Sequence, residues 1–93
     1  MTGYDRFDYN LRAIRELILA AFTAEELRAL VTYDEELGPL RHEFSPSDAI
    51  IDMAGKTIDY CRRFVSMEHF LSLVEEERPR QYARFEGKLR IHT

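Results

Sequence analysis

Apolar residues recur every three or four positions through most of this chain, and this spacing is the strongest constraint on its fold. Such a repeat places apolar side chains on one face of an α-helix, whereas a half-buried strand would alternate strictly between apolar and polar residues. No stretch of the chain alternates in that way. The first periodic set predicts a helix over residues 10–21 with these residues inward: Leu11, Ile14, Leu17, Ile18 and Ala21. We therefore expect an all-α protein.

A capping signal predicts the start of the second helix at Thr23. The Thr23 hydroxyl can accept from the third helical amide while the Glu26 carboxylate reaches back, which is the capping-box arrangement. Phe22 and Leu27 flank the box and are spaced to pack against each other as a hydrophobic staple. Apolar residues then continue along this helix at Leu30 and Val31.

The middle of the chain predicts a short irregular segment followed by a long helix. Residues 34–44 contain Gly38-Pro39 and favour a short third helix or a turn. Residues 45–48 predict a helix start, with a serine cap and a proline in the first turn. The expected apolar face of this helix is broad: Ile50, Ile51, Met53, Ala54, Ile58, Tyr60, Cys61, Phe64 and Val65. Gly55 should cost about 1 kcal/mol relative to alanine, which indicates either close packing or a helix that begins nearer Lys56.

Two further helices are predicted towards the C-terminus. Ser66 can cap a helix that runs to Glu77. Its inward residues are expected to be Met67, Phe70, Leu71 and Val74. Pro79 interrupts or restarts the chain, and residues 80–89 predict a last helix. That helix is expected to turn three residues inward: Tyr82, Phe85 and Leu89.

The length and composition predict one small domain. At 93 residues, 45% of them apolar and with a net charge of −4, the chain suits a single core with a polar surface. We expect a lead-in at residues 1–9, a compact antiparallel bundle of five to six helices at residues 10–90, and a tail at residues 91–93. The single cysteine and the lack of a leader pattern favour the cytoplasm. The longest apolar run, residues 17–22, is far shorter than the roughly twenty residues that span a bilayer, so no membrane partner is expected.

Sequence patterns typical of catalysis or cofactor binding are missing from the chain. Its four glycines are isolated from one another, so no phosphate-binding loop is predicted. The three histidines, His42, His69 and His92, match no metal-ligand spacing and are expected to be structural or exposed. Cys61 falls on an apolar stripe, which favours core packing over a reactive thiol. We predict no metal, no cofactor and no enzymatic activity.

Charge is unevenly distributed along the chain. In the second and third helices six acidic residues oppose only Arg28 and Arg41; they are Glu25, Glu26, Asp34, Glu35, Glu36 and Glu43. Near the C-terminus five basic residues oppose only Glu86; they are Arg78, Arg80, Arg84, Lys88 and Arg90. Two such surfaces permit head-to-tail association, which forms rings or filaments. Alternatively, both are ordinary solvated faces, with Glu75–Glu77 neutralising nearby arginines.

Four segments carry a family resemblance. They are Phe22-Thr23-Ala24-Glu25-Glu26-Leu27-Arg28-Ala29-Leu30, Ile58-Asp59-Tyr60-Cys61-Arg62-Arg63, Phe70-Leu71 and Arg78-Pro79-Arg80-Gln81-Tyr82. In order and spacing the chain resembles the effector-associated domains of bacteria, also called bacterial death-like domains, from about residue 11 to residue 85. It departs from the family at Phe64-Val65-Ser66, where many members have a glycine, and before the fourth helix, where the family is often rich in glycine and lysine.

The resemblance implies a death-fold-like six-helix adaptor that makes homotypic contacts. Domains of this family are attached to, or recruit, effectors in bacterial conflict and antiphage systems. By analogy, we expect the partner to be a second copy or another death-like domain, giving a homo-oligomer or filament. The expected interface joins an acidic group, Asp34, Glu35 and Glu36, to one of two basic groups: Arg80, Arg84 and Lys88, or Arg62 and Arg63.

Two other functions stay open from the sequence. A regulatory domain that packs only on its own parent chain would use an exposed apolar patch, for which Tyr4, Phe7 and Tyr9 are candidates; the same residues can instead fold back over the bundle. A DNA-binding regulator would use the basic side chains of residues 80–88 with steep salt dependence. The acidic pI of about 5.3 and the lack of a groove-reading motif argue against nucleic acid.

Overall fold

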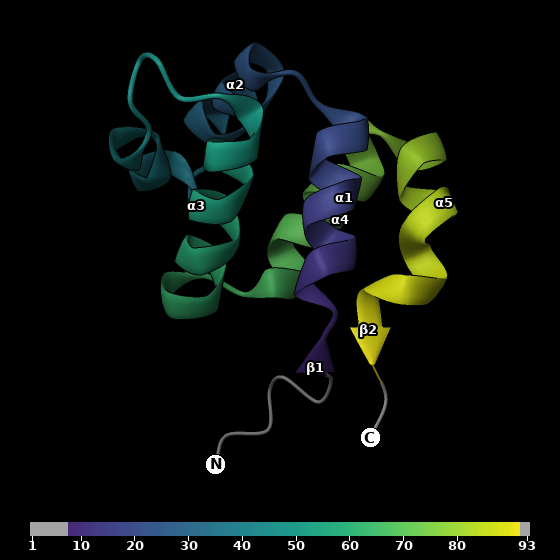
Figure 1. Cartoon of the computed structure of the whole chain (residues 1–93). Helices are drawn as coiled ribbons and strands as arrows, with labels where there is room; N and C mark the ends of the chain where they lie inside the picture. The colour runs from purple at the N-terminus through teal and green to yellow at the C-terminus, as the bar shows by residue number, and fades with distance from the viewer. Residues whose placement is uncertain (1–7, 92–93) are drawn as a thin grey trace.

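The computed structural model describes residues 8–91. Within this range the helices are α1 (Leu11–Ala21), α2 (Ala24–Tyr33), the 3-10 helix η1 (Gly38–Glu43), α3 (Ile50–Phe64), α4 (Met67–Glu77) and α5 (Pro79–Leu89). Two short strands flank them, β1 (Asp8–Tyr9) and β2 (Arg90–Ile91). The prediction of a small all-α bundle of five to six helices is confirmed (Figure 1).

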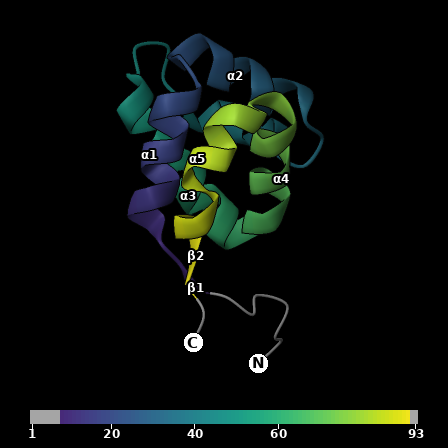
Figure 2. The ribbon, with the colours of Figure 1, turned by 90° about the vertical axis from the view of Figure 1, so that its right-hand side faces the viewer.

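Helix α1 lies in the middle of the bundle. Figure 1 shows it between α3 and α5, with α4 behind it, and α1 packs against both α3 and α5. The quarter-turn view in Figure 2 places α5 in front, with α1 and α4 on its two sides and α2 across the top. Consistent with this position, Ile14, Leu17 and Ile18 on α1 have no exposed surface.

Most residues expected to point inward form the core. The fully buried large side chains are Ile14, Leu17, Ile18, Leu27, Val31, Leu37, Leu40, Met53, Phe70, Leu71, Val74 and Leu89. Two expectations were wrong: Ile51 is 46% exposed and Phe64 is 68% exposed. Both lie in the terminal turns of α3, whose 15 residues span about 22 Å against about 16 Å for the 11-residue α1 and α4.

The caps predicted at Thr23 and Ser66 form as expected, and Asn10 provides a third cap that was not predicted. The Thr23 hydroxyl accepts from the Glu26 amide at 3.2 Å, and the Glu26 carboxylate accepts from the Thr23 amide at 2.9 Å, which completes the capping box. Asn10 caps α1 by accepting from the Ala13 amide, and Ser66 caps α4. These contacts satisfy amides that have no partner within the first helical turn.

The start of α3 differs from the sequence prediction. Residues 45–48 form a turn and not a helix start, because the Asp48 carboxylate accepts from the Ser45 amide at 2.9 Å and from Lys56 Nζ at 2.7 Å. The helix begins at Ile50 without a side-chain cap. Gly55 lies inside this helix with open space around it, so neither close packing nor a later helix start explains the glycine.

The two ends of the described chain are joined, which the sequence did not predict. β1 and β2 pair antiparallel, with Asp8 opposite Ile91 and Tyr9 opposite Arg90. Strands of two residues are too short to show a period, so no pattern indicated them. Tyr9, expected as part of an exposed or folded-back aromatic group, donates its hydroxyl proton to Glu68 at 2.6 Å. The other two aromatics of that group, Tyr4 and Phe7, lie outside the described residues.

Candidate interaction surface

The acidic candidates divide into one structural residue and two exposed ones. Asp34 accepts from the Glu36 and Leu37 amides at 3.1 and 3.0 Å and lies 3.0 Å from His69 Nε2. Its side chain is only 15% exposed, so Asp34 holds the turn after α2. Glu35 and Glu36 are exposed beside it. Of this predicted group, these two glutamates are therefore the ones positioned to meet a partner.

Two of the five C-terminal basic residues are used inside the molecule. Arg78 donates from Nε to the Ala21 carbonyl at 3.0 Å, pairs with Glu26 at 3.2 Å and covers the Phe22 ring at 5.1 Å. The pKa of Glu26 is lowered, first by the hydrogen bond from the Thr23 backbone and then by Arg78. Arg78 therefore ties the junction of α4 and α5 to the junction of α1 and α2.

Arg90 is the second internal cation. It makes a two-pronged contact with Glu68, with both hydrogen bonds at 2.7 Å, and a third with the Tyr82 hydroxyl. These contacts raise the pKa of Arg90, while Arg90 and then the Tyr9 hydroxyl lower the pKa of Glu68. Glu68 thus links β1 and β2 to the first turn of α4.

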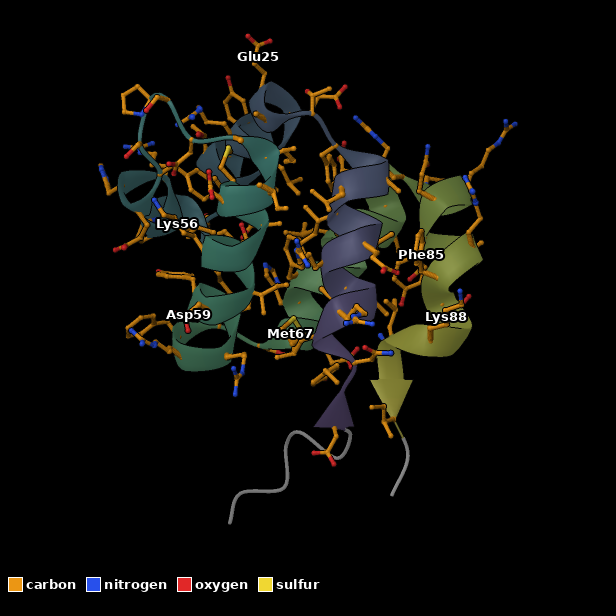
Figure 3. All side chains as sticks on the ribbon, in the orientation of Figure 1. Glu25, Lys56, Asp59, Met67, Phe85 and Lys88 are labelled. Carbon is orange, nitrogen blue, oxygen red and sulfur yellow. The ribbon has the colours of Figure 1, made fainter. Side chains whose placement is uncertain are left out.

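The other three basic residues form a row along the exposed face of α5. Arg80, Arg84 and Lys88 are all exposed and stand four residues apart, so they share one face of the helix. Within residues 8–91 neither Arg80 nor Arg84 has an ion pair, so the predicted neutralisation by Glu75–Glu77 does not occur there. Lys88 lies over the Phe85 ring at 5.9 Å, and Figure 3 shows both residues along α5. We call these three residues the basic row.

We call the exposed pair Glu35 and Glu36 the acidic turn. The basic row and the acidic turn lie on opposite sides of the bundle. In Figure 1 α5 is at one edge, and η1, which follows Glu35 and Glu36, is at the other edge beyond α3. One molecule therefore cannot bring the two groups together. Two molecules can, in a head-to-tail contact.

The second predicted basic group lies at the C-terminal end of α3. Arg62 and Arg63 are exposed there, and only Arg63 has an ion pair in the described chain, with Asp59 at 3.5 Å. Phe64 ends the helix beside them, and its ring contacts that of Tyr60 in a tilted arrangement with centroids 5.1 Å apart. The apolar pattern predicted Phe64 in the core, so an exposed aromatic residue next to two cations was not expected there. We call Arg62, Arg63 and Phe64 the α3 knob.

An apolar groove between α2 and α4 was also missed. Its volume is about 360 Å³, and its walls include Phe22, Leu30, Tyr33 and Leu73. Tyr33, at the end of α2, is 87% exposed, the highest value among the exposed large apolar residues. Leu30 was expected on the apolar face of its helix, and Leu73 was not assigned to a face. The structure shows that both line an open surface between α2 and α4. We call this the α2–α4 groove.

The expected chemistry of the cysteine agrees with its surroundings. Cys61 is 1% exposed, and burial, followed by the negative charge of Asp34, raises its thiol pKa to about 12. Such a thiol is not ionised near neutral pH and is a poor nucleophile.

No cluster of three or more His, Cys, Asp or Glu side chains able to hold a metal ion occurs among residues 8–91. None of the helices in that range is both long enough and apolar enough to cross a membrane. Comparison of the chain with models of known protein families, with curated proteins and with solved structures finds no match.

Proposed function

We propose that this chain is a non-enzymatic interaction domain that binds a second copy of itself or a similar domain. The observation that carries the proposal is the basic row, whose arginines have no ion pair within the described chain. The row lies on the side of the molecule opposite the exposed glutamates of the acidic turn (Figure 1). Complementary charge on opposite sides of one small body favours a head-to-tail contact that repeats from copy to copy.

The resemblance to bacterial death-like domains supports the same function. Domains of that family are adaptors that recruit or oligomerise effectors in bacterial defence signalling, and we propose the same role for this chain. The domain would act by binding alone, in the cytoplasm, by raising the local concentration of the proteins attached to it.

The proposal is tested by measuring self-association of the domain by sedimentation velocity or light scattering from about 10 μM to about 1 mM, the range of weak contacts. Raising the salt from about 0.1 to about 1 M shortens the screening length from about 10 to about 3 Å and should weaken association. Arg84→Glu should abolish it. Arg15→Glu, an equal charge reversal at an exposed arginine of α1, should leave it unchanged.

A wild-type protein that stays monomeric at about 1 mM and low salt would contradict self-association. Equal loss of association in Arg84→Glu and Arg15→Glu would show that total charge matters and that the basic row has no special role. Salt-sensitive binding to DNA that depends on Arg84 would favour the nucleic-acid alternative.

A further inference from the structure

The α3 knob is an exposed aromatic residue flanked by cations. Phe64 is 68% exposed although a side chain of this kind is usually buried. Arg62 and Arg63 precede it on the last turn of α3 and are exposed with it. Aromatic residues and arginine are the types that contribute most binding energy at protein interfaces.

The α2–α4 groove has the complementary character. Its floor and walls are apolar, and its volume of about 360 Å³ suits a few side chains. Three carboxylates, Glu26, Asp34 and Glu77, and one cation, Arg78, also line it. Asp34 is engaged by His69 and by the amides of its own turn. Arg78 is already paired with Glu26, and Glu77 has no ion pair within the described chain. An apolar side chain that arrives with positive charge beside it therefore fits this groove best.

The knob and the groove cannot meet within one molecule. The knob directly precedes the first turn of α4, whereas Leu73 and Glu77 of the groove lie in the second half of that helix. Figure 3 shows Met67, at the start of α4, in the lower half of the bundle, and Glu25 of α2 at the top. Along α4, Leu73 lies about 9 Å and Glu77 about 15 Å from Met67, so the two surfaces are apart.

We propose that the occupant of the α2–α4 groove is the α3 knob of a second copy of this chain, with Phe64 between Leu30, Tyr33 and Leu73. Arg62 and Arg63 of the entering copy then face Glu77, the groove carboxylate that has no ion pair within the described chain. Because each copy offers its knob at one end and its groove at the other, the contact is heterologous and continues into rings or filaments. The proposal rests on the proposed function, which it deepens by giving the second predicted basic group, Arg62 and Arg63, an apolar anchor.

The test uses two single variants and one control, each at an exposed position so that the fold is retained. Phe64→Ser removes the anchor, and Ala29→Phe fills the groove from within with a ring of the same size. Ile51→Ser removes an exposed apolar side chain from the other end of α3. In sedimentation velocity, the first two should weaken self-association by about 30-fold or more, and the control should match the wild type. Circular dichroism melting curves verify that all three are folded.

Mixing the two variants is the decisive measurement. Phe64→Ser keeps an intact groove and Ala29→Phe keeps an intact knob, so the mixture should form a one-to-one dimer and nothing larger. Each variant alone should stay monomeric at the same concentration.

Each failure has its own signature. Wild-type association that is equally strong in Phe64→Ser and Ala29→Phe would overturn the knob and groove while leaving the charge contact of the proposed function intact. Loss only in Ala29→Phe would mean that another segment occupies the groove, which also overturns the assignment of Phe64. A wild type that never associates would contradict the self-association on which both proposals rest.

Discussion

Replacing Glu68 with glutamine is expected to loosen both ends of the described chain from the bundle. The Glu68 carboxylate accepts two hydrogen bonds from Arg90 at 2.7 Å and one from the Tyr9 hydroxyl at 2.6 Å. Arg90 belongs to β2 and Tyr9 to β1, so one carboxylate on α4 holds both strands. Glutamine keeps the size of the side chain and removes its charge.

The expected loss follows from the geometry and the exposure of the contact. Hydrogen bonds to a charged group contribute about 1.5–3 kcal/mol when shielded from water. The Glu68 side chain is 40% exposed and that of Arg90 is 24% exposed, so solvent screening reduces the contribution towards that of a surface ion pair. We expect Glu68→Gln to cost about 1.5 kcal/mol in total. In a domain of this size that corresponds to a fall in Tm of about 6–12 °C.

The pH dependence gives a second check. Because Arg90 and Tyr9 lower the folded-state pKa of Glu68 below its ordinary value of 4.5, the unfolded state binds more protons in acid. The stabilisation is therefore complete above pH 4.5 and is lost as the pH falls through the folded-state pKa. Thermal unfolding followed by circular dichroism should show a wild-type advantage at neutral pH that disappears in strong acid.

Glu75→Gln is the matched control, since it removes the same charge from an exposed position on α4 that has no ion pair within the described chain. Its stability should stay within about 0.5 kcal/mol of the wild type. An equal Tm for wild type and Glu68→Gln at neutral pH would refute the reasoning. So would a difference that persists undiminished in strong acid, because a protonated carboxyl group cannot form the ion pair.

Two further predictions concern α3. Gly55→Ala should raise the free energy of unfolding, measured in urea, by about 0.5–1 kcal/mol, because a methyl group there meets open space and alanine favours the helix. A loss of stability would show that the site is constrained. Cys61 should react with an aromatic disulfide reagent only after unfolding, because the native thiol is buried with a pKa of about 12. Rapid labelling of the native protein at neutral pH would contradict this.

The helices and their caps were largely predictable because the contacts that define them are local. The Thr23 and Glu26 capping box joins residues three apart, and the apolar repeat of α1 reflects the helical period itself. The start of α3 was mispredicted for the opposite reason. Asp48 is engaged by Lys56, eight residues further on, and a serine and proline pattern does not reveal that competition.

The candidate surface was predicted only in part. The exposed glutamates and the basic row follow from charge counts and helical spacing. However, Arg78 and Arg90 appeared equivalent to Arg80 and Arg84 until their internal partners were known. Phe64 could not be placed at the surface from an apolar pattern, since a pattern does not state where the neighbouring helices end.

By itself, the sequence determined that this chain folds into helices and where most of them begin and end. It also determined which faces of α1, α2 and α4 are buried. These properties depend on residues a few positions apart. Only the tertiary structure decided the pairing of β1 with β2, the linkage of Tyr9 and Arg90 through Glu68, and the internal role of Arg78. It also decided that Phe64 is exposed and that α2 and α4 enclose a groove. The physical reason is distance along the chain: the Tyr9 to Glu68 contact joins residues 59 apart, and the Arg78 to Ala21 contact joins residues 57 apart.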